Sequence, residues 1–305
     1  MASWFQNGVS GLQSVVLYSL PELDGAIDAI PLGGLVRDDI YLCEERLIRL
    51  SSRMKSWHNL RQKGNEHKKV AVPLYGFPPN VGAIGTAALM NVPESLERML
   101  VRLHEEGYHI PAGVIENVRD AASPHDDVPA GDRFGERVVK ALTRMLDAGV
   151  VYDGTQRIKE EGAKIPLPEG VELVAETVTV STIRSWLNFP EEWGPSEWGP
   201  LPILPRSSFL YDAFIKQWGN AAGGLESVLG LGTNAKGESI VCGIKVGNVF
   251  ICVQPVLGLE GDPMRLLFER DLTPHAQYIA QYLWLQQSYR ADGTNEQQRK
   301  LAKIR

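Results

Sequence analysis

The sequence predicts an α/β fold with parallel-sheet βα units and an irregular insertion rich in Trp, Gly and Pro. A strand candidate at 69–77 is followed by a glycine-bearing loop and a helix that ends near residue 106. Strand, loop and helix in this order are the building block of a parallel sheet. A strand pair at 239–255 and a terminal helix at 273–289 predict a second unit. With 305 residues, 44% of them hydrophobic, the chain is long enough for about two domains.

Composition excludes several classes of protein. The formal net charge is −6 and the pI about 5.6, without clustered Lys and Arg, so a nucleic-acid binder is not expected. Cys43, Cys242 and Cys252 stand far apart, which argues against a structural zinc site or a disulfide framework and favours a reducing compartment. No apolar run reaches the roughly 20 residues of a transmembrane helix. The first residues lack the features of a secretory signal, so none is expected.

The first third of the chain contains three expected elements. Val15 to Tyr18 predict a short buried strand that ends at Pro21. Residues 38–60 predict a surface helix with an apolar stripe, formed by Leu42, Arg46, Leu47, Leu50 and Met54. The strand at 69–77 is expected at a sheet edge or near its end because Pro73 has no N–H to donate.

Two helices follow in the middle of the chain. The first has apolar residues at helical spacing and ends at Gly107; these residues are Leu96, Met99, Leu100 and Leu103. The second is expected at 133–149. Residues 153–206 carry much Gly, Pro and Trp and include the tandem "EEWGP" and "SEWGP". We therefore predict three segments, namely an α/β unit at 1–150, an irregular insertion at 151–206 and a second α/β unit at 207–305.

The last segment is predicted as a helix, a hairpin and a helix. Residues 207–219 form the first helix, and the alternating runs on both sides of Gly247-Asn248 predict the hairpin. The final helix is expected to have Thr273 as N-cap and Pro274 at its first position.

Candidate chemistry gathers in the stretch "VQPVLGLEGDPMRLLF" at 253–268. Asp262 before Pro263 is typical of a capped helix start, whereas Glu260 lies just outside it, so a ligand-facing role and a simple cap are both open. Arg265 most simply pairs with one of these acids. The loop at 78–88 has two glycines but matches neither a dinucleotide fingerprint nor a P-loop, so no nucleotide site is predicted.

His275 and Tyr278 are candidates on the last helix. His275 is expected in its first turn, where the helix dipole disfavours the imidazolium and leaves a neutral base; a solvent-facing histidine is the alternative. Tyr278 lies on one helix face with Ile279, Tyr282 and Leu283. The default interpretation is that this face packs in a core, and the alternative is that it stacks on a flat aromatic ligand. These residues alone do not name a substrate.

Three stretches carry a family resemblance. They are "PELDGAI" at 21–27, "FPPNVGAIGTAA" at 77–88 and "GNVFICVQPVLGLEGDPMRLLF" at 247–268, and they resemble the porphyrin-binding H subunits of magnesium chelatase, which are related to CobN of cobalt chelatase. The resemblance covers most of 11–292 and is loose over 150–206. Family members are several times longer. This chain lacks their head domain, and after Arg290-Ala291-Asp292 it departs from the "HFGTHG" strand-loop that is expected to follow.

The resemblance implies a subunit that binds protoporphyrin IX while the substrate Mg2+ is inserted. It implies that two AAA+ partner subunits hydrolyse ATP, so that this chain binds no cofactor and no resident metal. Glu260, Asp262 and His275 are the implied catalytic residues, the acids removing water from Mg2+ and the imidazole accepting a pyrrole proton. Gln254, Arg265 and Tyr278 are the implied substrate contacts.

The expected function is a fragment or short form of this subunit that is not catalytic alone. The alternatives are an interaction fragment that contacts chelatase partners without binding porphyrin, and a subunit of the cobalt chelatase type. The resemblance implies a chloroplast stroma or a bacterial cytoplasm, and no transmembrane segment.

Overall fold

The computed structural model describes residues 11–26, 29–30, 32–36, 39–75, 86–87, 90–121, 133–151, 154–187, 203–204, 236–255 and 275–292. The chain divides into two compact units. Unit 1 contains residues 1–59 and 189–227 together with Arg305, and unit 2 contains residues 60–188 and 228–304. This division differs from the predicted boundaries near 150 and 206, because unit 2 collects strands from all three predicted segments.

Unit 1 combines helical turns with a small sheet. A continuous helical stretch is formed by α2 (Leu12–Ser14), the π-helical η1 (Val15–Ser19) and α3 (Leu20–Leu23). The sheet has the order β1-β2-β7, with β1 (Gly33–Val36), β2 (Asp39–Cys43) and β7 (Ile203–Leu204). The long helix α4 (Glu44–Gln62) follows β2, and its last three residues are counted in unit 2.

Two predictions for unit 1 need correction. The strand expected at Val15 to Tyr18 is wrong, since these residues are helical and Val15 and Val16 are about half exposed. A short apolar run does not distinguish a strand from a helix, which is the reason for the error. The helix expected at 38–60 begins instead at Glu44, because residues 39–42 pair with β1 and Cys43 pairs with β7.

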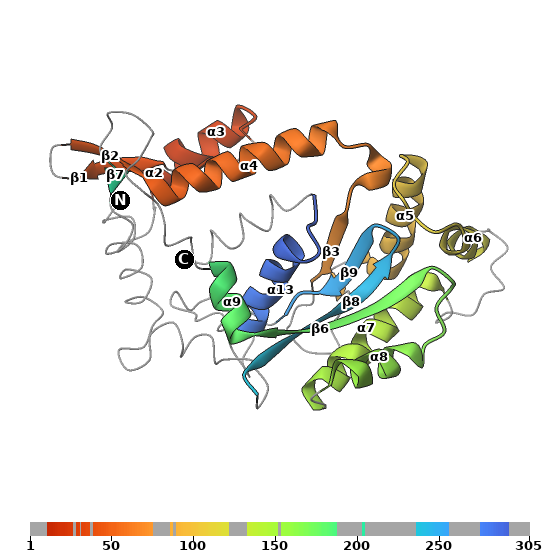
Figure 1. The fold of residues 1–305 in the computed structure, drawn as a ribbon. Helices are drawn as coiled ribbons and strands as arrows, with labels where there is room; N and C mark the ends of the chain where they lie inside the picture. The colour runs from red at the N-terminus through yellow and green to blue at the C-terminus, as the bar shows by residue number, and fades with distance from the viewer. Residues whose placement is uncertain are drawn as a thin grey trace. The chain divides into compact units, whose positions relative to one another are not determined.

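The sheet of unit 2 has four strands in the order β3-β9-β8-β6 (Figure 1). They are β3 (Val70–Leu74), β6 (Val171–Thr179), β8 (Glu238–Val246) and β9 (Val249–Val253). The α/β class is thus confirmed. Only β3 and β9 pair in parallel, while β9 with β8 and β8 with β6 are antiparallel. The pairing of β8 with β9 is antiparallel because the two-residue turn between them leaves no room for a crossover helix.

The predicted hairpin is confirmed. Val246 pairs with Val249 across the turn, and Gly247 has a φ of 58°, a value that favours glycine. A Cβ at this position would come 2.3 Å from the backbone oxygen of His109, so the turn also lies close to another loop.

Four helices contribute to one side of the sheet: α5 (Val92–Glu105), α6 (Ala112–Ala121), α7 (Phe134–Val151) and α8 (Thr155–Ala163). Leu100, Leu142 and Ile158 are fully buried and share a core with Ile244 and Ile251 of the sheet. The predicted end of α5 is confirmed, because Gly107, with a φ of 84°, follows it. Asn91, which was not predicted as a cap, accepts from the N–H of Glu94 at the start of the helix. The short elements η2 (Asn65–His67), β4 (Thr86–Ala87) and β5 (Met90–Asn91) complete the connections.

The helix α13 (Ala276–Gln287) covers the other side of the sheet (Figure 1). The ring of Phe250 contacts those of Trp284 and Tyr289, with centroids 5.0 and 5.3 Å apart. Gly243 makes room for this ring, since a Cβ there would lie 2.3 Å from its tip. The helix α9 (Val180–Leu187) packs beside α13. Unit 2 is therefore a sheet between two helical layers.

Part of the segment that was predicted as an irregular insertion forms helices and a strand. Residues 154–187 form α8, β6 and α9, and β6 pairs with β8 along nine residues. The tandem Trp-Gly-Pro sequences and the helix expected at 207–219 lie outside the described residues. Within the described ranges, no helix is both long and apolar enough to cross a membrane.

Candidate functional site

The candidate site lies at the carboxyl ends of the parallel strands β3 and β9. Leu74 pairs with Val253 in the last register position of both strands. Of the three stretches that carry the family resemblance, the one at 77–88 follows β3 in the sequence, and the one at 247–268 contains β9. Loops at the carboxyl ends of parallel strands are the usual place for ligands in α/β proteins.

Gln254 is the first residue after β9 and is held on two sides. Its backbone N–H donates to the carbonyl of Leu74 at 2.9 Å, which continues the pairing with β3. Its side-chain Oε1 accepts from the hydroxyl of Tyr282 at 3.0 Å. The predicted substrate contact Gln254 thus sits at the site, with its side chain fastened to α13.

Tyr278 and Tyr282 lie one turn apart on α13, with ring centroids 4.8 Å apart and planes at 54°. They are only 4% and 1% exposed. Burial raises the pKa of the Tyr278 phenol, and a hydrogen bond with Tyr282 partly opposes this, so the group stays protonated at neutral pH. The ring of Tyr278 has the geometry of a packed core residue, which was its default interpretation.

His275 is the N-cap of α13, with extended backbone angles of −68° and 146°. Its carbonyl accepts from the backbone N–H groups of Tyr278 and Ile279. The residue is half-buried, and its imidazole makes no capping hydrogen bond. The helix thus begins later than predicted, with His275 rather than Thr273 in the capping position. Because Tyr282 reaches Gln254 and Trp284 reaches Phe250, α13 runs antiparallel to β9 and its start lies beyond the carboxyl end of that strand.

The other predicted residues are not placed. Three of the predicted site residues lie outside the described residues, namely Glu260, Asp262 and Arg265. Within the described part of the chain, no group of three or more His, Cys, Asp or Glu side chains could hold a metal ion.

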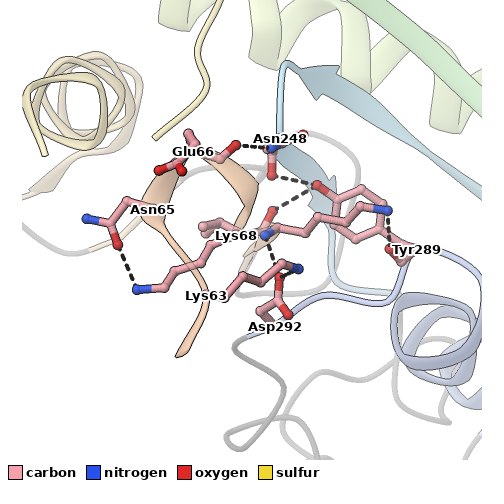
Figure 2. A network of polar contacts seen from close by, with 9 residues as sticks. Lys63, Asn65, Glu66, Lys68, Asn248, Tyr289 and Asp292 are labelled. Atoms are coloured by element: carbon pink, nitrogen blue, oxygen red, sulfur yellow. Dashed lines mark hydrogen bonds and ion pairs between the residues drawn. The ribbon is translucent and has the colours of Figure 1, made fainter. Parts of the chain in front are cut away.

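A polar network at the opposite end of the sheet was not predicted (Figure 2). Asn248 in the hairpin turn is its centre, because its carbonyl accepts from the N–H of Val70 at 2.9 Å and from the hydroxyl of Tyr289 at 2.7 Å. Its N–H donates to His109 and its side-chain amide to the carbonyl of Glu66, at 3.0 and 2.8 Å. These contacts fasten the hairpin to β3 and to the end of α13.

Asp292 completes this network. Its carboxylate accepts from the ammonium of Lys63 at 2.6 Å and from the backbone N–H of Lys69 at 2.8 Å. Its own N–H donates to the carbonyl of Lys69 at 2.9 Å, and the ammonium of Lys69 donates to the carbonyl of Tyr289 at 3.2 Å. The only feature of the sequence that pointed to this network was the end of the family resemblance at Arg290-Ala291-Asp292. Every partner in this network is a residue of the fold, so we assign it to stability rather than to ligand binding.

The two cysteines of the sheet are poor candidates for chemistry. Cys242 and Cys252 are free and buried, and burial raises the pKa of both thiols to about 12. Since the thiolate is the reactive form, neither is a nucleophile near neutral pH.

Comparison with known proteins relates the whole chain to one family. The family described as CobN/Magnesium Chelatase matches residues 1–294. The H subunit of magnesium chelatase from Chlorobaculum parvum is 33% identical over 289 residues, which are 95% of this chain and 18% of that protein. The chloroplastic ChlH subunit of magnesium chelatase from Oryza sativa subsp. indica is 28% identical and covers 93% of this chain and 16% of its own length. The CobN subunit of aerobic cobaltochelatase from Pseudomonas aeruginosa is 25% identical over 95% of this chain and 20% of its own length.

A solved structure with a similar fold is available for comparison. The catalytic subunit of cobaltochelatase from Mycobacterium tuberculosis superposes with a TM-score of 0.53 and 21% identity, over 94% of this chain and 20% of that one. The chain thus spans about a fifth of the length of the relatives it matches. Because the family match extends over nearly the whole sequence, this chain belongs to the CobN/magnesium chelatase family.

Proposed function

We propose that this chain is a portion of the porphyrin-binding subunit of magnesium chelatase, the enzyme that inserts Mg2+ into protoporphyrin IX for chlorophyll biosynthesis. The carboxyl ends of β3 and β9 form part of the face that holds the porphyrin. Family membership and the higher identity to an H subunit of magnesium chelatase, 33% against 25% for CobN, support the magnesium assignment.

The observation that carries this proposal is the pairing of Leu74 with Val253. Leu74 comes shortly before the family stretch at 77–88, and Val253 lies within the family stretch at 247–268, although 179 positions separate these two residues in the sequence. The start of α13 lies beyond the same strand ends, so its free N–H groups favour an anion there. The propionates of a porphyrin are anions of a suitable kind.

The chemistry expected at this face is the dehydration of Mg2+ and the removal of two pyrrole protons. Mg2+ prefers oxygen ligands and loses its water slowly, so Glu260 and Asp262 are the proposed acids that exchange with it. His275 is the proposed general base, because an imidazole nitrogen has a lone pair that can accept a pyrrole proton. Gln254 and Arg265 are the proposed contacts to the porphyrin, while Tyr278 supports them from the core.

We propose that AAA+ partner subunits hydrolyse ATP and that this chain binds no cofactor. Since the chain spans only about a fifth of its relatives, it does not insert Mg2+ by itself. An assay with both partner subunits, ATP, Mg2+ and protoporphyrin IX tests this, and the appearance of magnesium-porphyrin fluorescence above a protein-free blank would contradict it.

Porphyrin binding is tested by a spectral titration of the 305-residue chain. Protoporphyrin IX should give a saturable shift of its Soret band, and Gln254→Ala should weaken binding roughly tenfold if its side chain contributes about 1.4 kcal/mol. The matched control is Gln156→Ala, on α8, away from the carboxyl ends of the strands. A flat titration, or equal losses in both variants, would remove the proposed site.

The two alternatives give other outcomes. An interaction fragment would co-purify with the AAA+ subunits but leave the Soret band unchanged. A subunit of the cobalt chelatase type would bind a corrin precursor in preference to protoporphyrin IX.

The names of the relatives support a chloroplast stroma or a bacterial cytoplasm as the compartment. Recovery of the chain in the membrane fraction of its source cells would oppose this.

A further inference from the structure

The side-chain amide of Gln254 is held in one orientation by a buried phenol. The hydroxyl of Tyr282 donates to its Oε1 at 3.0 Å. Tyr282 is only 1% exposed, so its proton needs an acceptor inside the protein, and an amide oxygen is a suitable one. The backbone N–H of Gln254 donates to the carbonyl of Leu74 at 2.9 Å, which fixes the point from which the side chain starts. Both the base of this side chain and its oxygen are thus held in place.

This orientation decides which end of the amide meets a ligand. A glutamine amide has an oxygen that accepts hydrogen bonds and an NH2 group that donates them. With Oε1 directed to Tyr282, the Nε2 group is directed away from that phenol. Among the described residues, Tyr282 is the one hydrogen-bond partner of this half-buried side chain. Gln254 therefore offers N–H donors at the carboxyl end of β9.

N–H donors select a hydrogen-bond acceptor in the ligand. They do not serve Mg2+, because this cation is bound by oxygen atoms. The rim of protoporphyrin IX carries methyl and vinyl groups, which are apolar, and propionate groups, which are ionised carboxylates. A carboxylate forms shorter and stronger hydrogen bonds with N–H donors than a neutral acceptor does. A propionate is therefore the part of the porphyrin that suits the amide of Gln254.

We propose that Tyr282 is a positioning residue that orients the amide of Gln254 as a donor to a propionate carboxylate of the porphyrin. This inference rests on the proposed function. It adds to that function the group that Gln254 recognises and the residue that makes this recognition possible. Tyr282 itself does not contact the porphyrin, since its hydroxyl is buried and acts through Gln254.

The test compares protoporphyrin IX with its dimethyl ester, which has the same macrocycle but no carboxylate. Soret titrations of the 305-residue chain with each porphyrin give the ratio of the two dissociation constants. In Tyr282→Phe the preference for the diacid should fall roughly threefold to tenfold, because the amide is free to turn. A loss of packing would instead weaken the binding of both porphyrins by the same factor and leave the ratio unchanged.

Gln254→Glu changes the donor directly. The new carboxylate keeps an oxygen for the hydroxyl of Tyr282 and places a second oxygen where Nε2 was, which repels a propionate. The preference for the diacid should fall at least about tenfold in this variant. The matched control is Tyr289→Phe, which removes a buried hydroxyl that bonds to Asn248 at the opposite end of the sheet and should keep the ratio of the parent chain.

The outcomes separate this inference from the proposed function. If the parent chain binds neither porphyrin, the proposed function fails and this inference fails with it. If the parent chain binds protoporphyrin IX and Tyr282→Phe keeps its preference for the diacid, the proposed function stands and the positioning role of Tyr282 is wrong. An equal fall of the preference in Tyr289→Phe would also overturn the inference, because the effect would then not depend on the orientation of Gln254.

Discussion

The hydroxyl of Tyr289, just past the end of α13, donates a hydrogen bond to the carbonyl of Asn248 in the β8–β9 turn at 2.7 Å. The same ring packs on Phe250, so one residue joins the aromatic core to the hairpin. Tyr289→Phe keeps the ring and removes the hydroxyl. It should lower the free energy of unfolding by about 1 kcal/mol, measured by urea denaturation. An unchanged midpoint would mean that water replaces the bond at no cost.

High pH should destabilise the protein through the buried tyrosines. Burial raises the pKa of Tyr289 and Tyr278 above the usual value of about 10. As pH rises above about 10, these phenols ionise first in the unfolded chain, so the unfolded state binds fewer protons and the stability falls. The fall should be shallower in Tyr289→Phe. A denaturation series from pH 8 to 11 measures this, and identical slopes for both proteins would contradict it.

Removal of the Asp292 carboxylate should weaken the attachment of the chain after α13. Asp292→Ala leaves the N–H of Lys69 without its acceptor and the ammonium of Lys63 without its partner. A loss of about 1–3 kcal/mol is expected. Asp292→Asn, which keeps an acceptor for Lys69, should lose less. The control Glu105→Ala removes an exposed ion pair with Arg102 and should change stability by less than about 1 kcal/mol. Similar losses in Asp292→Ala and the control would show that the attachment contributes little.

Glu97 should make stability depend on pH in the acid range. Its side chain is buried, and burial raises its pKa although its Oε1 accepts from the N–H of Gly135 at 2.7 Å. Between the unfolded pKa and this raised value, the folded state binds more protons, so stability falls as pH rises. Glu97→Gln keeps the acceptor and removes the charge. It should be at least as stable as the parent at pH 7, and its advantage should shrink toward pH 4.

A second variant separates charge from hydrogen bonding at this position. Glu97→Ala leaves the N–H of Gly135 unpaired at the start of α7 and should lose about 1–3 kcal/mol at every pH. If Glu97→Gln is as unstable as Glu97→Ala, the carboxylate is stabilised in the fold and the predicted pH dependence is wrong.

Gly243 should not tolerate a side chain. A Cβ there would lie 2.3 Å from the ring of Phe250 and 2.7 Å from the carbonyl of Ile251, so Gly243→Ala forces the ring or β9 to shift. Overpacking of this kind costs about 1–3 kcal/mol. The control is Gly154→Ala, where no atom lies within 4 Å of the added Cβ. Thermal denaturation of both variants measures the difference, and equal melting temperatures would contradict the packing of Phe250.

The elements that sequence patterns predicted well are the local ones. The end of α5 at Gly107 depends on neighbours within one helical turn. The hairpin at Gly247 likewise needs only alternating residues and a turn. The strand expected at Val15 failed because four apolar residues suit both conformations, and the regular elements at 154–187 were hidden by the Gly, Pro and Trp around them.

The residues of the candidate site stay a prediction. The pattern of the last helix led to His275 and Tyr278 and the resemblance to Gln254, and the structure brings Gln254 and α13 together through Tyr282. It also buries Tyr278, which a helical apolar stripe already favoured. The network of Asn248, Tyr289 and Asp292 was missed, because its residues are polar, scattered along the chain and without any local pattern.

By itself, the sequence determined the local elements and, through long motifs, the family. Helix caps, turns and apolar periodicity act over a few residues, so they can be read without knowledge of the rest of the chain. Only the tertiary structure decided that β3 lies beside β9 and that α13 crosses the sheet antiparallel to it. The pairing of β3 with β9 joins residues 179 positions apart. Both arrangements depend on burial that is shared among many side chains. No short stretch of sequence encodes that partner choice, and it is this choice that places the carboxyl ends of β3 and β9 side by side.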